Sequence, residues 1–359
     1  MKTPAQLSES IQRFQESFWD RKCTDRPPVG IYNEDIALPI KFLRQPFTRA
    51  TVYPEDVNGE LVATEYECIF AKRTVLSDDY LAFAAPWRGI PWLEAACGCP
   101  VRYSEGSLAP GHFVNSVKEL EQIPLPAPNA WLDCMRRETE RIQSEVPADC
   151  WANPSILRGP SDALAALRGM TEFFLDLHDN PQAVERAVSR INRTLMTAID
   201  IHYSVVDPKL GGFGNLFGYW APGKTFMMQE DALGMCSPSV YRDLFMPANA
   251  AIVKHLGSCV FFHFHSTGHQ HYQHVLDIPG IAGLQMCMES IGPSVLDMVP
   301  VFRKILEKTR LILQVGTGFE LLPEALRKLP REGLYLIIPS KFIPTDDAFR
   351  EFVAENLKR

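Results

Sequence analysis

Histidine is concentrated in one short stretch of this 359-residue chain. FFHFHSTGHQHYQH, residues 261–274, contains five of the nine histidines. An imidazole can bind a divalent metal or exchange a proton near neutral pH, so the stretch predicts one of these chemistries. His263 and His265 have the spacing that directs two side chains to one face of a β-strand, and we predict that they bind a metal together with a third ligand from elsewhere. Two alternatives stay open: a metal-free acid–base role for His265, or a packing role for both histidines.

Further polar candidates occur in two short segments. If QMCME (285–289) ends a strand, Cys287 and Glu289 share one face. Either Cys287 or Glu289 could reach the metal, and Cys287 is the predicted third ligand, although a cysteine is also a common small core residue. Glu289 is a predicted catalytic carboxylate, with a helix cap or an exposed surface position as the alternative. MMQED (227–231) supplies Gln229 as a predicted substrate-binding residue and an acidic pair, Glu230 and Asp231, which could simply complement the amino end of a helix.

Planar and basic side chains suggest where a substrate would bind. GGFGNLFGYWAPGK (211–224) contains Tyr219 and Trp220, whose rings suit an organic substrate or a corrin ring, or else pack a turn-rich loop. We predict a catalytic role for Tyr219 and a binding role for Trp220. PWRGIPW contains Trp87 and Arg88, and the arginine could hold a substrate carboxylate.

The elements that would position these residues follow a strand–helix rhythm from about residue 155. The predicted strands are short apolar runs: 80–85, 99–103, 155–159, 210–217, 258–265, 281–287, 311–316 and 334–339. The predicted helices are amphipathic and alternate with the later strands: 161–177, 237–257, 269–277, 295–309, 319–329 and 345–358. Short apolar strands that alternate with helices indicate a parallel sheet covered by helices.

A closed (β/α)₈ TIM barrel is the predicted fold, with a doubly wound open sheet as the alternative. We predict a single domain, residues 1–359, in which an irregular, proline-rich region (1–75) packs on the barrel as an amino-terminal extension. In such a barrel His265 lies at the carboxyl end of its strand, where barrel enzymes place their chemistry. Gly316, after another strand, could offer its backbone amide to a substrate anion.

Helical positions are predicted for the three remaining histidines of the stretch. His269, His271 and His274 fall in the helix expected over 269–277, and their spacing does not direct all three to one point. We therefore predict that they are mostly solvated. Ser161 is the predicted N-cap of the helix over 161–177, and Ser237, followed by Pro238, is the predicted cap of the helix over 237–257.

Composition excludes several classes of partner. A net charge of −7 argues against nucleic acid and anionic membrane, because both require a basic surface. A small-molecule substrate is therefore expected. The nine cysteines contain no Cys-x-x-Cys pair and are predicted to be reduced thiols, and the first ten residues have no apolar signal core. These features predict a cytoplasmic protein, either a monomer or a homodimer.

Several motifs, taken in order, resemble the uroporphyrinogen decarboxylase superfamily. They are GPSDALAALRGMTEFFLDLHDNP (159–181), EDALGMCSPSVYRDLFMP (230–247), HSTG (265–268) and the run before GLYLIIPS, and the resemblance extends from about residue 91 onward. The superfamily has a (β/α)₈ fold and includes corrinoid-linked methyltransferases that use zinc. The resemblance implies that Asp231 lines the mouth of the active site as a catalytic residue, and that Gly268 borders the substrate.

The departures from that pattern also matter. The decarboxylase branch needs an aspartate where our alignment has Gly89, and a basic loop motif that is absent around Arg44 and Arg49. The methyltransferase branch holds zinc with a His-x-Cys-Gly motif and a second cysteine after the last strand. This chain has Thr267 in place of the first cysteine, and Ser340 in the region where the second would fall. Any metal must therefore have other ligands.

The predicted function is a metal-assisted methyltransferase that moves a methyl group between a corrinoid, carried by a partner protein, and a small acceptor. Zinc is the expected metal. The alternative is a divergent lyase or decarboxylase, or a metal-free binding protein, that acts on a small carboxylate-bearing substrate other than uroporphyrinogen.

Overall fold

The computed structural model describes most of the chain. The described residues are 2–23, 25–32, 50–57, 73–86, 89–104, 107–122 and 129–358. Trp87 and Arg88, two of the predicted substrate-binding residues, lie outside them, as do Arg44 and Arg49. Within the described ranges, no helix is both long enough and apolar enough to cross a membrane.

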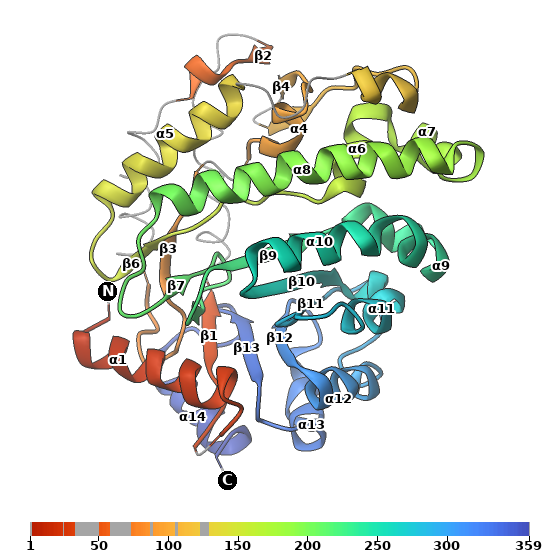
Figure 1. Ribbon diagram of the computed structural model, residues 1–359. Helices are drawn as coiled ribbons and strands as arrows, with labels where there is room; N and C mark the ends of the chain where they lie inside the picture. Colours follow the sequence, from red (N-terminus) through yellow and green to blue (C-terminus); the bar gives the residue numbers. More distant parts are fainter. Residues whose placement is uncertain are drawn as a thin grey trace.

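Six parallel strands form the main sheet, in the order β1-β13-β12-β11-β10-β9. Their bounds are β1 (Val29–Tyr32), β9 (Thr225–Gln229), β10 (Cys259–His265), β11 (Gly283–Met288), β12 (Arg310–Val315) and β13 (Leu334–Pro339). Figure 1 shows β9 to β13 side by side, with the helices that connect them on one side. The predicted α/β class with a parallel sheet and covering helices is confirmed.

The remaining strands form small separate sheets. β3 (Ala82–Ala84) and β6 (Cys150–Ala152) pair in parallel. β2 (Thr51–Val52), β4 (Val101–Ser104) and β5 (Ser107–Pro110) form an antiparallel sheet, so the strand expected over 99–103 is not a barrel strand. β7 (Phe213–Gly214) and β8 (Trp220–Ala221) make a short hairpin where a full strand was expected over 210–217.

The predicted closed barrel is not confirmed, because no continuous ladder closes the sheet among the described residues. Single backbone hydrogen bonds reach the two edges of the main sheet. Asp79, shortly before β3, donates its N–H to Val29 of β1 at 2.6 Å, and Gly159, beyond β6, donates to Gln229 of β9 at 2.6 Å. β3 and β6 pair with each other but form no ladder with β1 or β9 among the described residues.

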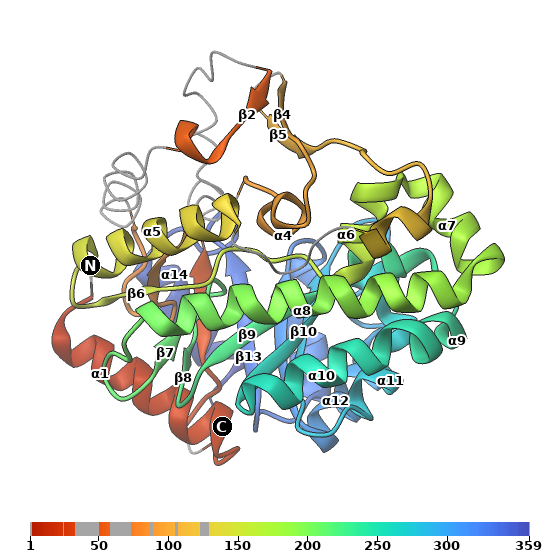
Figure 2. The ribbon, with the colours of Figure 1, turned by 45° about the horizontal axis from the view of Figure 1, so that its top comes forward.

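Helices alternate with the later strands, as the amphipathic pattern predicts. The longer ones are α1 (Pro4–Arg13), α5 (Ala130–Glu145), α6 (Pro160–Arg168), α7 (Met170–Asp179), α8 (Pro181–Val205), α10 (Met246–Leu256), α12 (Val299–Lys308), α13 (Leu322–Lys328) and α14 (Asp346–Asn356). Figure 2 shows α8 lying alongside α10. Shorter helical segments are α4 (Trp92–Ala96), α9 (Pro238–Val240), α11 (Tyr272–Leu276), the 3₁₀ helices η3 (Pro54–Asp56), η4 (Val117–Gln122), η5 (Asp231–Met235), η7 (Ser266–His271) and η8 (Phe319–Leu321), and the π-helices η1 (Phe14–Trp19) and η6 (Tyr241–Phe245).

Several local predictions need correction. The strand expected over 155–159 is irregular, whereas β9 arises from TFMMQ, for which no strand was predicted. The helix expected over 161–177 is two helices, because Gly169 adopts φ = 98° between them. Ser161 lies inside α6 and does not cap it. The cap at Ser237 is confirmed, since its side chain accepts from the N–H of Val240.

The two faces of β10 divide the core as its alternating pattern predicts. Phe262 and Phe264 join the cluster beneath the helices, while Phe261 joins a second apolar cluster on the other face of the sheet. Phe18 of η1 stacks on Phe261 there, with ring centroids 5.8 Å apart and planes 9° apart. Residues from the start of the chain, among them Phe14, Phe18 and Trp19, pack on this second cluster. The polar side chains of β10, His263 and His265, follow Phe261 toward the carboxyl end of the strand.

The amino-terminal region is only partly the extension that was predicted. Residues 29–32 form β1 and pair with β13, so this part of residues 1–75 belongs to the main sheet. Two buried aspartates hold it. Asp78 accepts the N–H of Ile31 at 2.7 Å, and Asp79 accepts the N–H of Val29 at 2.9 Å.

Candidate functional site

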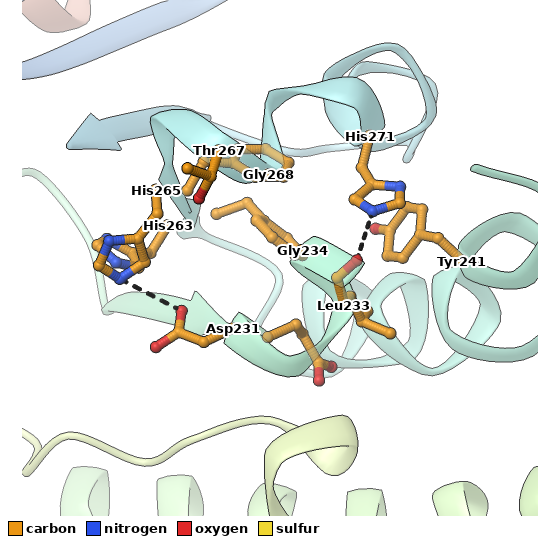
Figure 3. A pocket seen from close by; sticks show the side chains of 12 residues that line it. Asp231, Leu233, Gly234, Tyr241, His263, His265, Thr267, Gly268 and His271 are labelled. Atoms are coloured by element: carbon orange, nitrogen blue, oxygen red, sulfur yellow. Dashed lines mark hydrogen bonds and ion pairs between the residues drawn. The ribbon is translucent and has the colours of Figure 1, made fainter. Parts of the chain in front are cut away.

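The carboxyl ends of β9, β10 and β11 bring most of the predicted site residues together. His263 and His265 extend from β10, Asp231 follows β9, and Glu289 follows β11. Figure 3 shows the two imidazoles beside the Asp231 carboxylate. Neighbouring parallel strands end at one edge of a sheet, and this geometry gathers residues that are distant in sequence.

His265 lies between two carboxylates. Its Nδ1 is 2.7 Å from Glu289 Oε1, and its Nε2 is 3.7 Å from Asp231 Oδ1. Asp231 first, and then Glu289, raise the pKa of His265 to about 9 against the opposing effect of burial. Burial disfavours ionised Asp231, but its interaction with the imidazoles outweighs this effect and its pKa is lowered. Without a metal, the site therefore holds a protonated imidazole at neutral pH.

His263 is oriented by an amide on the next strand. Its Nδ1 is hydrogen-bonded to Oε1 of Gln285, the residue opposite it in the β10–β11 register. The ring lies 6.0 Å from the ring of Phe217 in a stacked arrangement. Burial lowers the pKa of His263, so this imidazole is neutral. In both histidines Nδ1 is held by a side chain of β11 or its end, and Nε2 remains for a ligand.

Two overlapping groups of side chains could hold a metal. The ligand atoms of Asp231, His263 and His265 all lie within 4.8 Å of one another, and so do those of His265, Cys287 and Glu289. Among the described residues, no group unites the predicted trio of His263, His265 and Cys287. Burial, and then the charges of Glu289 and Asp231, raise the pKa of the Cys287 thiol to about 12, which disfavours a thiolate there.

Asp231 is positioned by a carboxylate that the sequence did not reveal as functional. Asp162 of α6 accepts the backbone N–H of Asp231 at 3.0 Å and that of Ala232 at 2.7 Å. It thereby caps η5 in the way that a local N-cap residue would. The partners are 69 and 70 residues apart, so no local pattern could have identified the cap.

Glu230 forms a second link to α6 and lines the same pocket as the histidines. It accepts from the N–H of Ser161 at 2.8 Å and from the side-chain amide of Asn249 at 2.8 Å, and burial raises its pKa to about 7. A Cβ atom on Gly159 would collide with the Glu230 carboxyl group, so a glycine is required at this contact. Glu230 and Asp231 therefore join the end of β9 to α6 through hydrogen bonds. They do more than complement the positive end of a helix.

A small pocket opens beside these residues. Its cavity of about 90 Å³ has room for several water molecules or a small organic group. Asp231, Gly268 and Thr267 line it, and Gly268 lies opposite Gly234 of η5 with close backbone approach. Gly268 is thus near the site, as predicted, although no ligand contact tests its role.

The prediction that His271 is solvated is wrong. This residue is 2% exposed, lines the pocket and places Nε2 2.7 Å from the carbonyl oxygen of Leu233 (Figure 3). Its ring packs on Tyr241 at 5.2 Å between centroids. The cause is the 3₁₀ turn that follows β10, which directs His271 inward where a regular helix was expected. His269 and His274 are half-buried.

Tyr219 and Trp220 are not part of this site. The Tyr219 hydroxyl is 2.8 Å from Thr225 Oγ1, at the amino end of β9, and the ring is fully buried against Phe261. Trp220 is 5% exposed, and its carbonyl oxygen accepts from Trp19 Nε1. Phe217 of the same loop reaches His263, but the chain then turns toward the amino ends of the strands, so Tyr219 lies beside the start of β9.

Of the other predicted binding residues, Gln229 contacts Asp231, whereas Gly316 follows a different strand, β12. Gln229 ends β9 and its amide donates to Asp231 Oδ2, so it orients the Asp231 carboxylate. Gly316 directly follows β12, and a Cβ atom there would press on the carbonyl oxygen of Met288. Its predicted contact with a substrate anion stays a prediction. All eight cysteines within the described residues are free thiols, as expected.

Comparison with known proteins identifies a shared fold. No protein-family model matches the sequence, and no curated protein matches it. A solved structure of a methyltransferase from Methanosarcina mazei superposes with a TM-score of 0.62 at 14% sequence identity, and the match covers 92% of each chain. At this identity the likeness shows the fold alone. The proposed membership of the uroporphyrinogen decarboxylase superfamily therefore stays a prediction.

Proposed function

We propose that this protein is a methyltransferase that moves a methyl group between a corrinoid and a small acceptor, with a divalent metal bound by Asp231, His263 and His265. The observation that supports the proposal most strongly is that Nδ1 of each imidazole is held by a side chain, Gln285 of β11 for His263 and Glu289 just after β11 for His265. Metal-binding histidines in proteins are held in the same way. The structural likeness to a methyltransferase and the sequence resemblance support the reaction class.

The residues fit zinc in number, chemistry and spacing. Two imidazoles and one carboxylate form a common catalytic zinc set that leaves a fourth position open. Ligand atoms on a tetrahedral zinc lie about 3.4 Å apart, because each is about 2.1 Å from the metal. Asp231 Oδ1 and His265 Nε2 are 3.7 Å apart, so a small side-chain adjustment suffices. When bound, the metal would supply Lewis acidity that stabilises an acceptor thiolate.

The chain's own residues would orient the ligand set and select a small acceptor. Glu289 holds His265, while Gln229 and Asp162 hold Asp231. The acceptor would enter the small pocket beside Thr267. A methylated corrinoid would supply the methyl group, and an acceptor thiol in the pocket would lose its proton to solvent.

The corrinoid would remain outside, at the mouth, because a cavity of about 90 Å³ is far too small for a corrin ring. Two large apolar side chains near the site support a partner that covers this mouth. Met235, at the end of η5, is 68% exposed, and Ile291, two residues after Glu289, is 83% exposed. A partner that covers the mouth would meet these two side chains.

Metal content and methyl transfer together test this proposal. Protein purified without a histidine tag should bind stoichiometric zinc after incubation, and should demethylate methylcobalamin in the presence of mercaptoethanol. His265→Ala should lose most of the zinc and the turnover. Wild-type protein that stays metal-free after incubation with zinc, cobalt or nickel would rule out the metal.

A second candidate function rests on the protonated state of His265. Between Asp231 and Glu289, with a pKa of about 9, this residue is a cation at neutral pH in the metal-free protein. Such a group could bind or protonate a carboxylate-bearing substrate, as in the lyase alternative. In that case His265→Ala would abolish turnover of such a substrate, while the wild-type protein would carry no stoichiometric metal.

A further inference from the structure

A row of hydrogen-bonded side chains crosses the inner face of the main sheet from β10 to β1. It starts at His263, whose Nδ1 meets Oε1 of Gln285 on β11. Gln285 Nε2 donates to Gln314 Oε1 on β12 at 3.0 Å, and Gln314 Nε2 donates to the Tyr32 hydroxyl on β1 at 3.4 Å. These four side chains, from four strands, form a polar layer next to the aromatic cluster.

The direction of this row determines where His263 carries its proton. An amide oxygen can only accept a hydrogen bond and an amide nitrogen can only donate. Because Gln285 presents Oε1 to His263, the neutral ring must carry its hydrogen on Nδ1 and its lone pair on Nε2. If both amides were turned over, Nε2 would carry the hydrogen and could not bind a metal.

The direction of the row affects stability because Gln285 is buried and an unpaired amide group there would cost free energy. Gln285 has no exposed surface, so each end of its amide needs a partner within the protein. The Gln285 amide nitrogen donates to the side-chain oxygen of Gln314. The Gln314 amide nitrogen in turn donates to the Tyr32 hydroxyl. If only one of the two amides were rotated, oxygen would face oxygen or nitrogen would face nitrogen between Gln285 and Gln314.

We propose that Gln285 and Gln314 are positioning residues that hold His263 in the Nδ1–H tautomer. Glu289 likewise accepts a hydrogen bond from Nδ1 of His265, at 2.7 Å. The Nε2 lone pair of His263 is then available before any ligand arrives, whereas His265 is protonated at neutral pH in the metal-free protein and carries a hydrogen on both ring nitrogens. The inference deepens the proposed function, which gives the tautomer its purpose, but it concerns the metal-free protein.

Nitrogen NMR of the metal-free protein tests the tautomer directly. With ¹⁵N-labelled histidine, long-range proton–nitrogen spectra distinguish a protonated ring nitrogen from one with a lone pair. The His263 signals are identified by their loss in His263→Gln. We expect Nδ1 at the protonated position and Nε2 at the lone-pair position. The reverse assignment, or an equal mixture, would overturn the inference, and the wild-type spectrum alone decides this.

Substitutions at Gln314 test whether the row extends beyond Gln285. Gln314→Met removes the acceptor for the Gln285 amide, and the fraction of Nδ1–H tautomer should fall. Gln314→Glu keeps a side-chain oxygen at the same position and should restore it. Gln273→Met, an exposed glutamine on α11, is the control and should leave the His263 signals unchanged. A His263 tautomer that is unaffected by Gln314→Met would show that Gln314 has no positioning role.

These measurements separate the inference from the proposed function. No metal, corrinoid or acceptor is present in the NMR sample, so the absence of methyl transfer would leave the tautomer result intact. Conversely, an Nε2–H tautomer would overturn the positioning role of the glutamines without deciding which reaction the site performs.

Discussion

Two groups of ligand atoms meet at His265, and single substitutions separate them. If the metal is bound by Asp231, His263 and His265, then Asp231→Ala should lose most of the bound zinc, because it removes the only anionic ligand of that group. Cys287→Ala should keep the zinc, since the half-buried thiol has a pKa of about 12 and belongs to the other group. Zinc titration with a competing chelator measures both affinities. Loss of zinc in Cys287→Ala and its retention in Asp231→Ala would assign the metal to the alternative group.

His271 illustrates a second residue-scale effect, on stability. His271→Ala should lower the free energy of unfolding by about 1–3 kcal/mol, because the carbonyl oxygen of Leu233 loses a buried hydrogen-bond partner. Zinc content should stay unchanged. Denaturant unfolding measures the effect, and His178→Ala is a matched control, since that side chain is 92% exposed. Equal stability of the two variants would contradict a structural role for His271.

At the scale of elements, α6 positions the end of β9 through Asp162. Asp162→Ala removes the acceptor for two backbone N–H groups of η5 and should cost about 0.5–2 kcal/mol of stability. Because Asp231 begins η5, zinc affinity should also fall. Thermal unfolding and zinc titration measure the two effects on the same sample.

The control for this prediction is a cap elsewhere in the fold. Thr345→Ala removes the side chain that accepts from the N–H of Ala348 at the start of α14. It should reduce stability by a comparable amount and leave zinc affinity unchanged. If both variants bind zinc as the wild type does, Asp162 stabilises the fold without positioning the site.

For the whole molecule, buried ion pairs connect the start of the chain to the sheet. Asp79 is fully buried, and it binds Arg26 and Arg13 as well as the N–H of Val29. Burial opposes its ionisation, but the two arginines outweigh this effect and lower its pKa. The pKa of an aspartate in the unfolded chain is about 3.9. Because the pKa of Asp79 is lower in the folded protein, the ionised carboxylate stabilises the fold above about pH 3.9, and this contribution is lost as the pH falls through the pKa of the folded state.

Asp79→Asn should therefore reduce stability at pH 7 by about 3–5 kcal/mol, because it leaves two arginines partly unpaired. The difference from the wild type should shrink below about pH 4, where the wild-type carboxylate begins to lose its advantage. Denaturant midpoints at several pH values measure this. Asp243→Asn, which breaks an exposed pair with Arg242, should change little at any pH. A constant difference for Asp79→Asn across the acid range would contradict the assignment.

The sequence by itself was sufficient for the elements that have a strong local pattern. The later strands and helices were predicted to within a few residues, because continuous apolar runs and 3.6-residue periodicity are properties of the chain alone. The two-residue spacing in β10 likewise placed His263 and His265 on one face, opposite Phe262 and Phe264. The position of Glu289 near these histidines could also be expected from the end of its predicted strand, whereas Asp231 was placed there by the family resemblance, because no strand was predicted before it.

Only the tertiary structure decided which side chains complete the site. Asp162 caps a helix 69 residues away, and Gln314 completes a row that starts at His263, and neither relation leaves a local pattern. Tyr219 was misplaced because a glycine-rich loop carries no information about which end of the sheet it approaches. Spacing along the chain predicts which face a side chain takes, whereas long-range packing determines what that face meets, because the contacts between distant segments depend on the whole fold.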